Sequence, residues 1–160
     1  MGVEQKAIMI VGPGYEDIEA LYPYYRLGGA GIQVDVATTT GAEVKGRFGH
    51  PMPPVAGTAV IQNKDLKAEN YGLAIIAGGI DGAEKVRTVS ELVVFVKEMF
   101  GQGKVVASIC HGAWVLVEAD VVRGKKATCY PAMKTDLVNA GANYSTESVV
   151  VDGNLVTADR

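Results

Sequence analysis

The residues around Cys110 have the types and spacing of a nucleophile site. A short apolar run, Val105–Ile109, ends at this cysteine, and a second apolar run with helical character begins after Gly112. The pattern predicts a strand, a sharp turn and a helix, with the cysteine at the turn. Ser108 and Gly112 stand two residues to either side, as in a nucleophile elbow, where larger side chains would collide with the strained backbone.

A cysteine at such a turn is expected to be reactive. Unpaired backbone N–H groups and the positive end of the following helix favour the thiolate, so this position predicts a lowered pKa for Cys110. The alternative is that Cys110 is a small hydrophobic residue at the end of a core strand. The second cysteine, Cys129, allows only one internal disulfide. A soluble chain without a signal peptide is expected to keep both thiols reduced.

A second group of candidate residues lies where another predicted strand ends. The apolar run Leu73–Ala77 reads as a buried strand and is followed directly by Gly78 and Gly79. Glycines at the carboxyl end of a parallel strand can present backbone N–H groups to a ligand where a side chain would block its approach. The alternative is that they only form a turn.

The remaining pattern indicates an α/β chain. Residues 6–11 predict a buried strand, and an amphipathic helix with acidic residues at its start leads to a second strand at 32–36, which makes a parallel βαβ unit. Thr88 and Glu91 form a predicted capping box for a helix over 92–100. This helix would join the strand that ends at Gly78 to the strand that ends at Cys110, so we expect these two strands to be neighbours.

Two further regions are less regular. Residues 38–65 are rich in Gly and Pro, which predicts short antiparallel strands or a flap; His50 in this region is either a surface loop residue or a catalytic one. Near the C-terminus, residues 127–130 predict a short strand and Pro131 the first turn of a helix. Residues 148–157 predict a hairpin around Asp152-Gly153, with a type I′ turn.

Length and composition limit the class of protein. The 160 residues fit one domain, and the net charge of −3 offers no basic surface for nucleic acid or anionic lipid. No apolar run is long enough to span a membrane, and no signal peptide is visible, so we expect a cytoplasmic chain with small or neutral partners. Only His50 and His111 are histidines, and no spacing of ligand residues indicates a metal site.

Five segments together resemble one known family. They are SICHGAW, AGGIDG, GYEDIEALYPYYRL, TCYPAMKTDLVNAGA and VVVDGNLVT, and they occur in the family's order over nearly the whole chain. The sequence resembles the PfpI family of the class I glutamine amidotransferase-like superfamily, alongside glyoxalase III and protein deglycases. The resemblance implies a three-layer α/β/α sandwich, flavodoxin-like, with a mostly parallel sheet and no cofactor. It implies one domain over residues 1–160, without the C-terminal helix usual in relatives.

The resemblance also implies roles for particular residues. Cys110 matches the nucleophile and His111 its partner in a Cys-His pair. Glu16 matches the carboxylate that approaches the nucleophile. Glu84 is the best match to an acidic residue that completes a Cys-His-acid triad from a neighbouring subunit, which implies a homodimer or a higher homo-oligomer.

The oxyanion hole is implied in the same way. Gly78 and Gly79 match the glycines whose backbone, with the N–H of His111, forms it. Cys129 departs from the family, which more often has Ser at that position, so a second thiol is expected near or beneath the site.

Three functions follow from these residues. The first is a cofactor-independent cysteine enzyme of the glyoxalase III or deglycase type, in which Cys110 adds to a small carbonyl compound and Glu16 transfers a proton. The second is a cysteine peptidase or amidohydrolase that uses Cys110, His111 and a neighbour's Glu84 on a peptide. The third is a non-enzymatic oxidative-stress sensor or chaperone, in which Cys110 is oxidised to a sulfinate.

Overall fold

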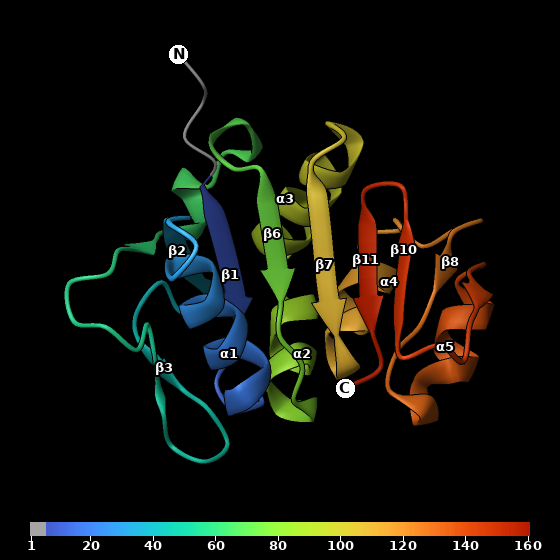
Figure 1. Cartoon of the computed structure of the whole chain (residues 1–160), viewed down its shortest axis with the longest axis horizontal. Coiled ribbons are helices and arrows are strands. Elements are labelled where there is room, and N and C mark those ends of the chain that lie inside the picture. Colours follow the sequence, from blue (N-terminus) through green and yellow to red (C-terminus); the bar gives the residue numbers. More distant parts are fainter. Residues whose placement is uncertain (1–5) are drawn as a thin grey trace.

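A single mixed sheet forms the centre of the molecule. The computed structural model describes residues 6–160. Seven strands lie in the order β10-β11-β7-β6-β1-β2-β5, and all neighbouring pairs are parallel except β10 with β11 (Figure 1). The strands are β1 (Ala7–Val11), β2 (Val34–Thr38), β5 (Val60–Ile61), β6 (Leu73–Ile76), β7 (Val105–Ile109), β10 (Val149–Asp152) and β11 (Leu155–Ala158).

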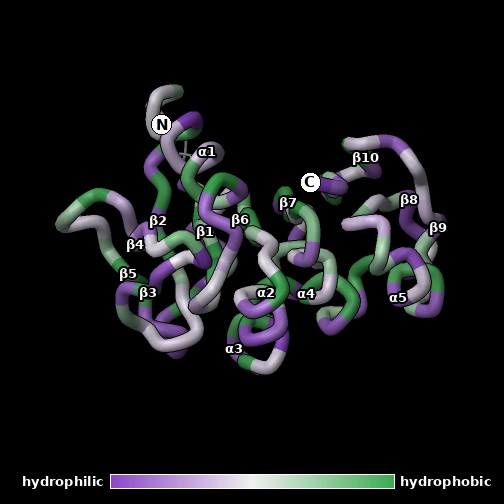
Figure 2. Tube along the Cα trace, turned by 90° about the horizontal axis from the view of Figure 1, so that it is seen from below, coloured by the Kyte–Doolittle hydropathy of each residue, from purple (hydrophilic) through white to green (hydrophobic). Residues whose placement is uncertain are grey.

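Helices cover both faces of this sheet. Figure 2 shows α1 on one side of the strands and α2, α3 and α4 on the other. The helices are α1 (Asp17–Gly28), α2 (Ile80–Arg87), α3 (Ser90–Gly101), α4 (Ala113–Glu118) and α5 (Lys134–Asn139). The predicted three-layer α/β/α sandwich is thus confirmed.

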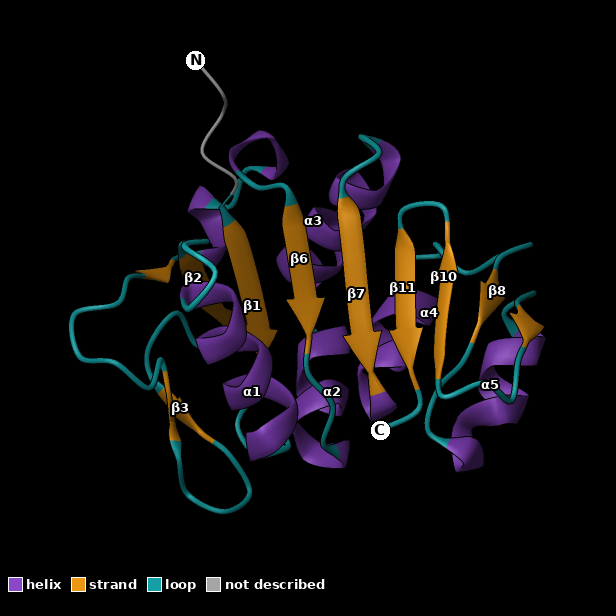
Figure 3. Cartoon of the chain, viewed as in Figure 1, coloured by secondary structure: helices purple, strands orange, loops and turns teal. Residues whose placement is uncertain are grey.

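Short elements fill the connections, as the secondary structure in Figure 3 shows. The strand β3 (Val44–Lys45) pairs antiparallel with β4 (Pro51–Met52), and β8 (Lys126–Ala127) pairs parallel with β9 (Asn143–Tyr144). Tight 3₁₀ turns lie at Asn63–Asp65, Ala68–Asn70, Cys110–Gly112 and Pro131–Met133.

The core divides into two apolar clusters because side chains alternate across the sheet. In β1, Ile8 and Ile10 pack with α2, α3 and α4, whereas Met9 packs on the side of α1. Every residue of β1 is buried, which explains its near-continuous apolar run. On the side of α1, β6, β7 and β11 border an apolar groove that also contacts Ile18 and Tyr22 of the helix.

The main connections follow the predictions. The βαβ unit β1-α1-β2 and the hairpin β10-β11 are confirmed. The strands β6 and β7 pair in parallel, as expected from the connection between them. A 3₁₀ turn that begins at Pro131 leads into α5, as the proline predicted.

Four local predictions are wrong. The connection from β6 to β7 contains two helices, because α2 begins directly after Gly79. Thr88 does not cap α3; its hydroxyl donates to the carbonyl of Lys85 at 2.7 Å and closes α2. Within residues 38–65, β3 and β4 form the predicted antiparallel pair, but β5 joins the main sheet parallel to β2.

The fourth concerns the turn between β10 and β11. Asp152 pairs with Leu155, so the turn residues are Gly153 and Asn154. Only Gly153, with φ of 64°, has positive φ, which is the pattern of a type II′ turn instead of type I′.

Candidate active site

Cys110 lies at the carboxyl edge of the sheet, at a strained turn. It follows β7 directly, begins the 3₁₀ turn that leads to α4, and has φ of 58°. Such a conformation is uncommon for a residue with a side chain and indicates a functional constraint. A Cβ on Gly112 would lie 2.6 Å from the carbonyl oxygen of Ile76, so the turn needs a glycine there.

The carboxylate beside the thiol belongs to Glu19, in the first turn of α1. Its Oε2 accepts the backbone N–H of Gly78 at 2.9 Å, and the carboxylate also forms a hydrogen bond with the Cys110 thiol. An added Cβ on Gly78 would collide with the Glu19 carboxylate and lie 2.8 Å from Cβ of Cys110. Gly78 therefore leaves room for the carboxylate and the thiol to meet.

The prediction that Glu16 approaches the thiol is corrected by this arrangement. Glu16 is the N-cap residue of α1, with extended backbone angles, and its carboxylate pairs with Arg47 at 3.0 Å. A residue inside the first turn of a helix points its side chain back toward the N-terminus, which brings Glu19 over the strand ends. Both acids occur in the segment GYEDIEA, and their phase on the helix decides which reaches the thiol.

Burial and the Glu19 carboxylate raise the pKa of Cys110 to about 12, although the N–H groups of His111 and Gly79 act in the opposite direction. The prediction of a lowered thiol pKa is therefore wrong. The helix after the turn, α4, has only six residues. Burial also raises the pKa of Glu19. With Glu19 ionised, the thiol is protonated and its proton can pass to the carboxylate.

Two backbone N–H groups favour the ionised form of the reacting sulfur. They belong to His111 and Gly79, and both act to lower the pKa of the Cys110 thiol. Gly79 has φ of 87°, and a Cβ there would lie 2.5 Å from the backbone nitrogen of Glu16. The N–H of Gly78, the third group considered for the oxyanion hole, is instead bound by Glu19.

His111 folds back onto the residue that precedes it. Its Nδ1 lies 3.3 Å from Sγ of Cys110. The ring stacks on Tyr130, with centroids 4.7 Å apart, and meets the edge of Trp114 at 5.1 Å. Burial lowers the pKa of His111, so the imidazole is neutral near pH 7 and able to accept a proton.

Glu84, the expected partner from a neighbouring subunit, does not belong to this cluster within one chain. It lies on α2 with an exposed side chain, and it pairs with Arg87 at 3.6 Å.

His50 helps to hold the loop over residues 46–50 in place. Its Nδ1 lies 2.7 Å from Oδ1 of the buried Asp17, which also accepts the N–H groups of Phe48 and His50. Burial opposes ionisation of Asp17, but these contacts prevail and lower its pKa. The contacts hold the loop over 46–50 against the start of α1.

Cys129 lies in the apolar core, fully buried. Burial, with Asp136 as a smaller cause, raises the pKa of its thiol to about 11. Its neighbour Tyr130 donates its N–H to the carbonyl of Cys110 at 3.4 Å, so the segment of the second thiol runs beside the turn.

The sequence reading missed three residues of this site: Glu19, Trp114 and Tyr130. Of these, only Glu19 could have been predicted from the sequence, because it stands one helical turn beyond Glu16. Within residues 6–160, no three His, Cys, Asp or Glu side chains are grouped as metal ligands. In the same range no helix is long and apolar enough to cross a bilayer.

Comparison with known proteins places this chain in a family. The model of the DJ-1/PfpI family matches residues 5–160. A curated relative, Deglycase PH1704 of Pyrococcus horikoshii, is 35% identical over 153 residues, which cover 96% of this chain and 89% of the relative. Drosophila melanogaster DJ-1beta superposes with a TM-score of 0.85 at 29% identity, covering 98% of this chain and 82% of that one.

A larger solved structure contains the same domain. It is a two-domain protein of Anabaena variabilis with DJ-1/ThiJ/PfpI-like and ferritin-like domains, and it matches with a TM-score of 0.90 at 36% identity. The match covers 98% of this chain and 44% of that protein. With its sheet, its elbow cysteine and these relatives, the chain belongs to the DJ-1/PfpI family.

Proposed function

We propose that this protein is a cofactor-independent cysteine enzyme that acts on reactive carbonyl compounds, of the glyoxalase or deglycase type. One observation carries the proposal: the Glu19 carboxylate is hydrogen-bonded to the Cys110 thiol within a single chain. A nucleophile and a proton acceptor in direct contact are what addition to an aldehyde requires. The name of the Pyrococcus horikoshii relative, a deglycase, supports the same class.

The first step is addition of sulfur to the aldehyde carbon of an α-oxoaldehyde. As the S–C bond forms, the thiol proton passes to Glu19 and the electron pair of the C=O bond moves onto oxygen. The N–H groups of Gly79 and His111, which favour the ionised form of the sulfur, are placed to stabilise this alkoxide. Glu19 returns the proton to that oxygen, which gives a hemithioacetal.

The second step moves a proton between adjacent carbons. The Glu19 carboxylate takes the proton from the former aldehyde carbon and delivers it to the neighbouring carbonyl carbon. The hydroxyl proton of the hemithioacetal moves to the oxygen of that carbonyl through an enediol, which leaves a thioester of a hydroxy acid on Cys110. Water then cleaves the thioester, releases the hydroxy acid and restores the thiol. The reaction needs no external oxidant or reductant, because the oxidation of one carbon balances the reduction of the other.

The test uses reduced protein and methylglyoxal, with lactate as the measured product. We expect turnover by the wild type and none by Cys110→Ser. The matched control is Cys129→Ala, which changes the thiol that lies in the core. Cleavage of chromogenic peptides, without turnover of methylglyoxal or glycated amines, would contradict the proposal.

The contact between His111 and Cys110 favours a second candidate, a cysteine peptidase. Nδ1 of His111 lies 3.3 Å from Sγ, within reach of the thiol proton. Glu84 is exposed on α2, so only another copy of the chain can bring it to His111. The peptidase therefore requires a homo-oligomer, whereas the carbonyl enzyme needs only one chain. Inactivity of the reduced protein on all these substrates would favour a thiol sensor.

A further inference from the structure

The orientation of His111 needs a cause outside the turn. His111 and Cys110 are consecutive residues, and consecutive side chains do not ordinarily face each other. Within residues 6–160, the only side-chain hydrogen bond of the ring is its contact with Sγ at 3.3 Å. Its orientation therefore depends on the two aromatic rings that it touches, Tyr130 and Trp114.

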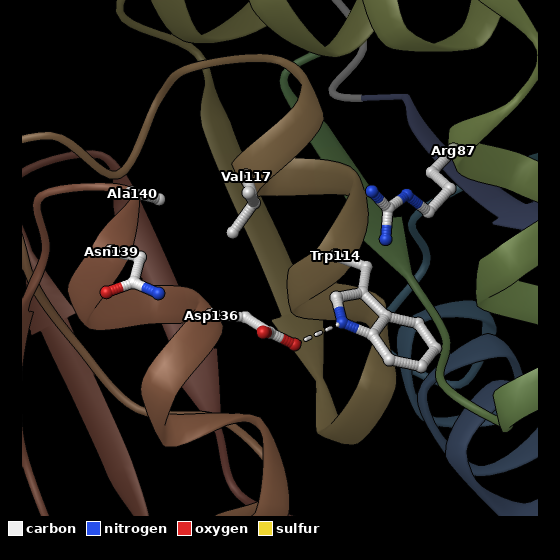
Figure 4. Close-up of a pocket in the computed structure, with 6 residues that line it drawn as sticks. All are labelled: Arg87, Trp114, Val117, Asp136, Asn139 and Ala140. Atoms are coloured by element: carbon white, nitrogen blue, oxygen red, sulfur yellow. Dashed lines mark hydrogen bonds between the residues drawn. The ribbon is translucent and has the colours of Figure 1, made fainter.

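Trp114 is the ring that has an anchor of its own. Its indole N–H donates to Oδ2 of Asp136 at 2.9 Å, which ties α4 to α5. Figure 4 shows this bond at the edge of a cavity of about 430 Å³ that Arg87 and Asn139 also line. The guanidinium of Arg87 lies 5.8 Å from the centre of the indole ring.

We propose that Asp136, acting through the indole of Trp114, is a positioning residue that holds Nδ1 of His111 against the Cys110 thiol. Asp136 touches no reacting atom. By fixing the indole N–H it fixes the ring edge that packs on His111, and it thereby limits the rotation of the imidazole. Without this bond the partly buried indole is free to turn, and His111 loses one of its two supports.

The predicted consequence is a change in the titration of His111. Burial by its neighbours lowers the pKa of this residue. If the indole is released, water reaches the ring and the titration midpoint rises toward that of an exposed histidine, about 6.5. The charged groups around the cluster are Cys110 and Glu19 toward the sheet edge, Arg87 with its partners Glu84 and Glu118 on one side, and Asp136 on the other.

The experiment follows the His111 ring protons by NMR across pH 5–9, with the rate of Cys110 alkylation by iodoacetamide measured on the same samples. Asp136→Ala and Trp114→Phe should each raise the His111 midpoint and slow alkylation several-fold at pH 6. Asp136→Asn keeps an oxygen acceptor and should resemble the wild type. Asn139 lines the same cavity, and Asn139→Ala should change neither the His111 midpoint nor the rate of alkylation.

The double variant of Asp136→Ala with Trp114→Phe should be no worse than either single one, because both remove the same bond. An unchanged His111 midpoint in Asp136→Ala would overturn the proposal, as would additive effects in the double variant. The midpoint is read from the His111 resonances of the folded form alone, so an unfolded fraction with separate resonances does not enter it. The proposal rests on Cys110 as the nucleophile of the proposed function, but neither readout needs turnover, so the two can fail separately.

Discussion

Replacing Glu19 by Gln should change the reactivity of the Cys110 thiol and the turnover of substrate in opposite directions. The change removes the negative charge beside Cys110 but keeps the shape and one hydrogen-bond donor. A carboxylate next to a thiol opposes thiolate formation, so the pKa of Cys110 should fall. A carboxamide cannot exchange protons as a carboxylate does, so the carbon-to-carbon proton transfer should be lost. We therefore expect faster alkylation and slower turnover in the same variant.

The sizes expected for faster alkylation and slower turnover follow from the raised pKa of Cys110 and from the usual effect of losing a proton-transfer group. The pKa of Cys110 is raised from 9.0 to about 12, with burial as the largest cause and the Glu19 carboxylate as the next. A rise of this size corresponds to a free-energy cost of about 4 kcal/mol for forming the thiolate. If the loss of the carboxylate charge recovers one unit, the thiolate fraction at neutral pH rises about tenfold. Loss of a proton-transfer group typically lowers turnover by about 10²- to 10⁴-fold.

The assay compares Glu19→Gln with Glu16→Gln, since both neutralise an acid at the start of α1. Iodoacetamide alkylation of Cys110 at pH 7.5, read by mass spectrometry, reports the thiolate, and lactate formation from methylglyoxal reports catalysis. Glu16→Gln should leave both close to the wild type, because the Glu16 carboxylate pairs with Arg47 instead of the thiol.

Two outcomes would refute this reasoning. Intact methylglyoxal turnover in Glu19→Gln would remove Glu19 as the proton carrier and favour the triad of His111 with a neighbour's Glu84. Slower alkylation in Glu19→Gln would show that the carboxylate activates the thiol more than it suppresses ionisation.

Three further outcomes are expected. Gly79→Ala should destabilise the protein by at least about 2 kcal/mol, because φ is 87° and the new Cβ would meet backbone atoms at 2.5 Å. Gly28 in α1 has open space around it, so Gly28→Ala should not destabilise the protein. Thermal unfolding of the two variants tests the difference. The lowered pKa of Asp17 means that its ionised form stabilises the fold above the unfolded-state pKa of about 3.8, and that this contribution is lost as the pH falls below it. The stability difference between wild type and Asp17→Asn in urea unfolding should therefore be largest near pH 6 and shrink below pH 4; a constant difference would contradict the role of the contacts to His50. Light scattering should show a dimer or larger assembly, and Glu84→Gln should spare methylglyoxal turnover while abolishing any peptidase activity; a monomer at micromolar concentration would rule out a carboxylate supplied by a second copy.

The elbow and the sheet could be read from the sequence because local chemistry determines them. A buried parallel strand must be apolar on both faces, so β1 and β6 are continuous apolar runs. A nucleophile turn tolerates only small neighbours, and Gly112 marks it because a Cβ there would strike the backbone at the end of the neighbouring strand, β6. The helix α2 was missed because Gly82 and four charged residues leave it only a short apolar pattern.

The environment of the thiol was decided only by the tertiary structure. The sequence places Glu16 and Glu19 in one acidic segment, but the start and phase of α1 determine that Glu19 reaches Cys110 and that Glu16 meets Arg47. The pKa of Cys110 depends on burial and on that carboxylate, which are properties of packing.

The support of His111 also comes from distant segments. Trp114 and Asp136 are 22 residues apart, and the bond between them exists because α4 and α5 pack side by side. Tyr130 reaches His111 from the segment after β8. Local sequence determines strands, turns and small residues because each depends on its own neighbours in the chain. Contacts between side chains at the sheet edge depend on how several elements pack, and no local pattern encodes that.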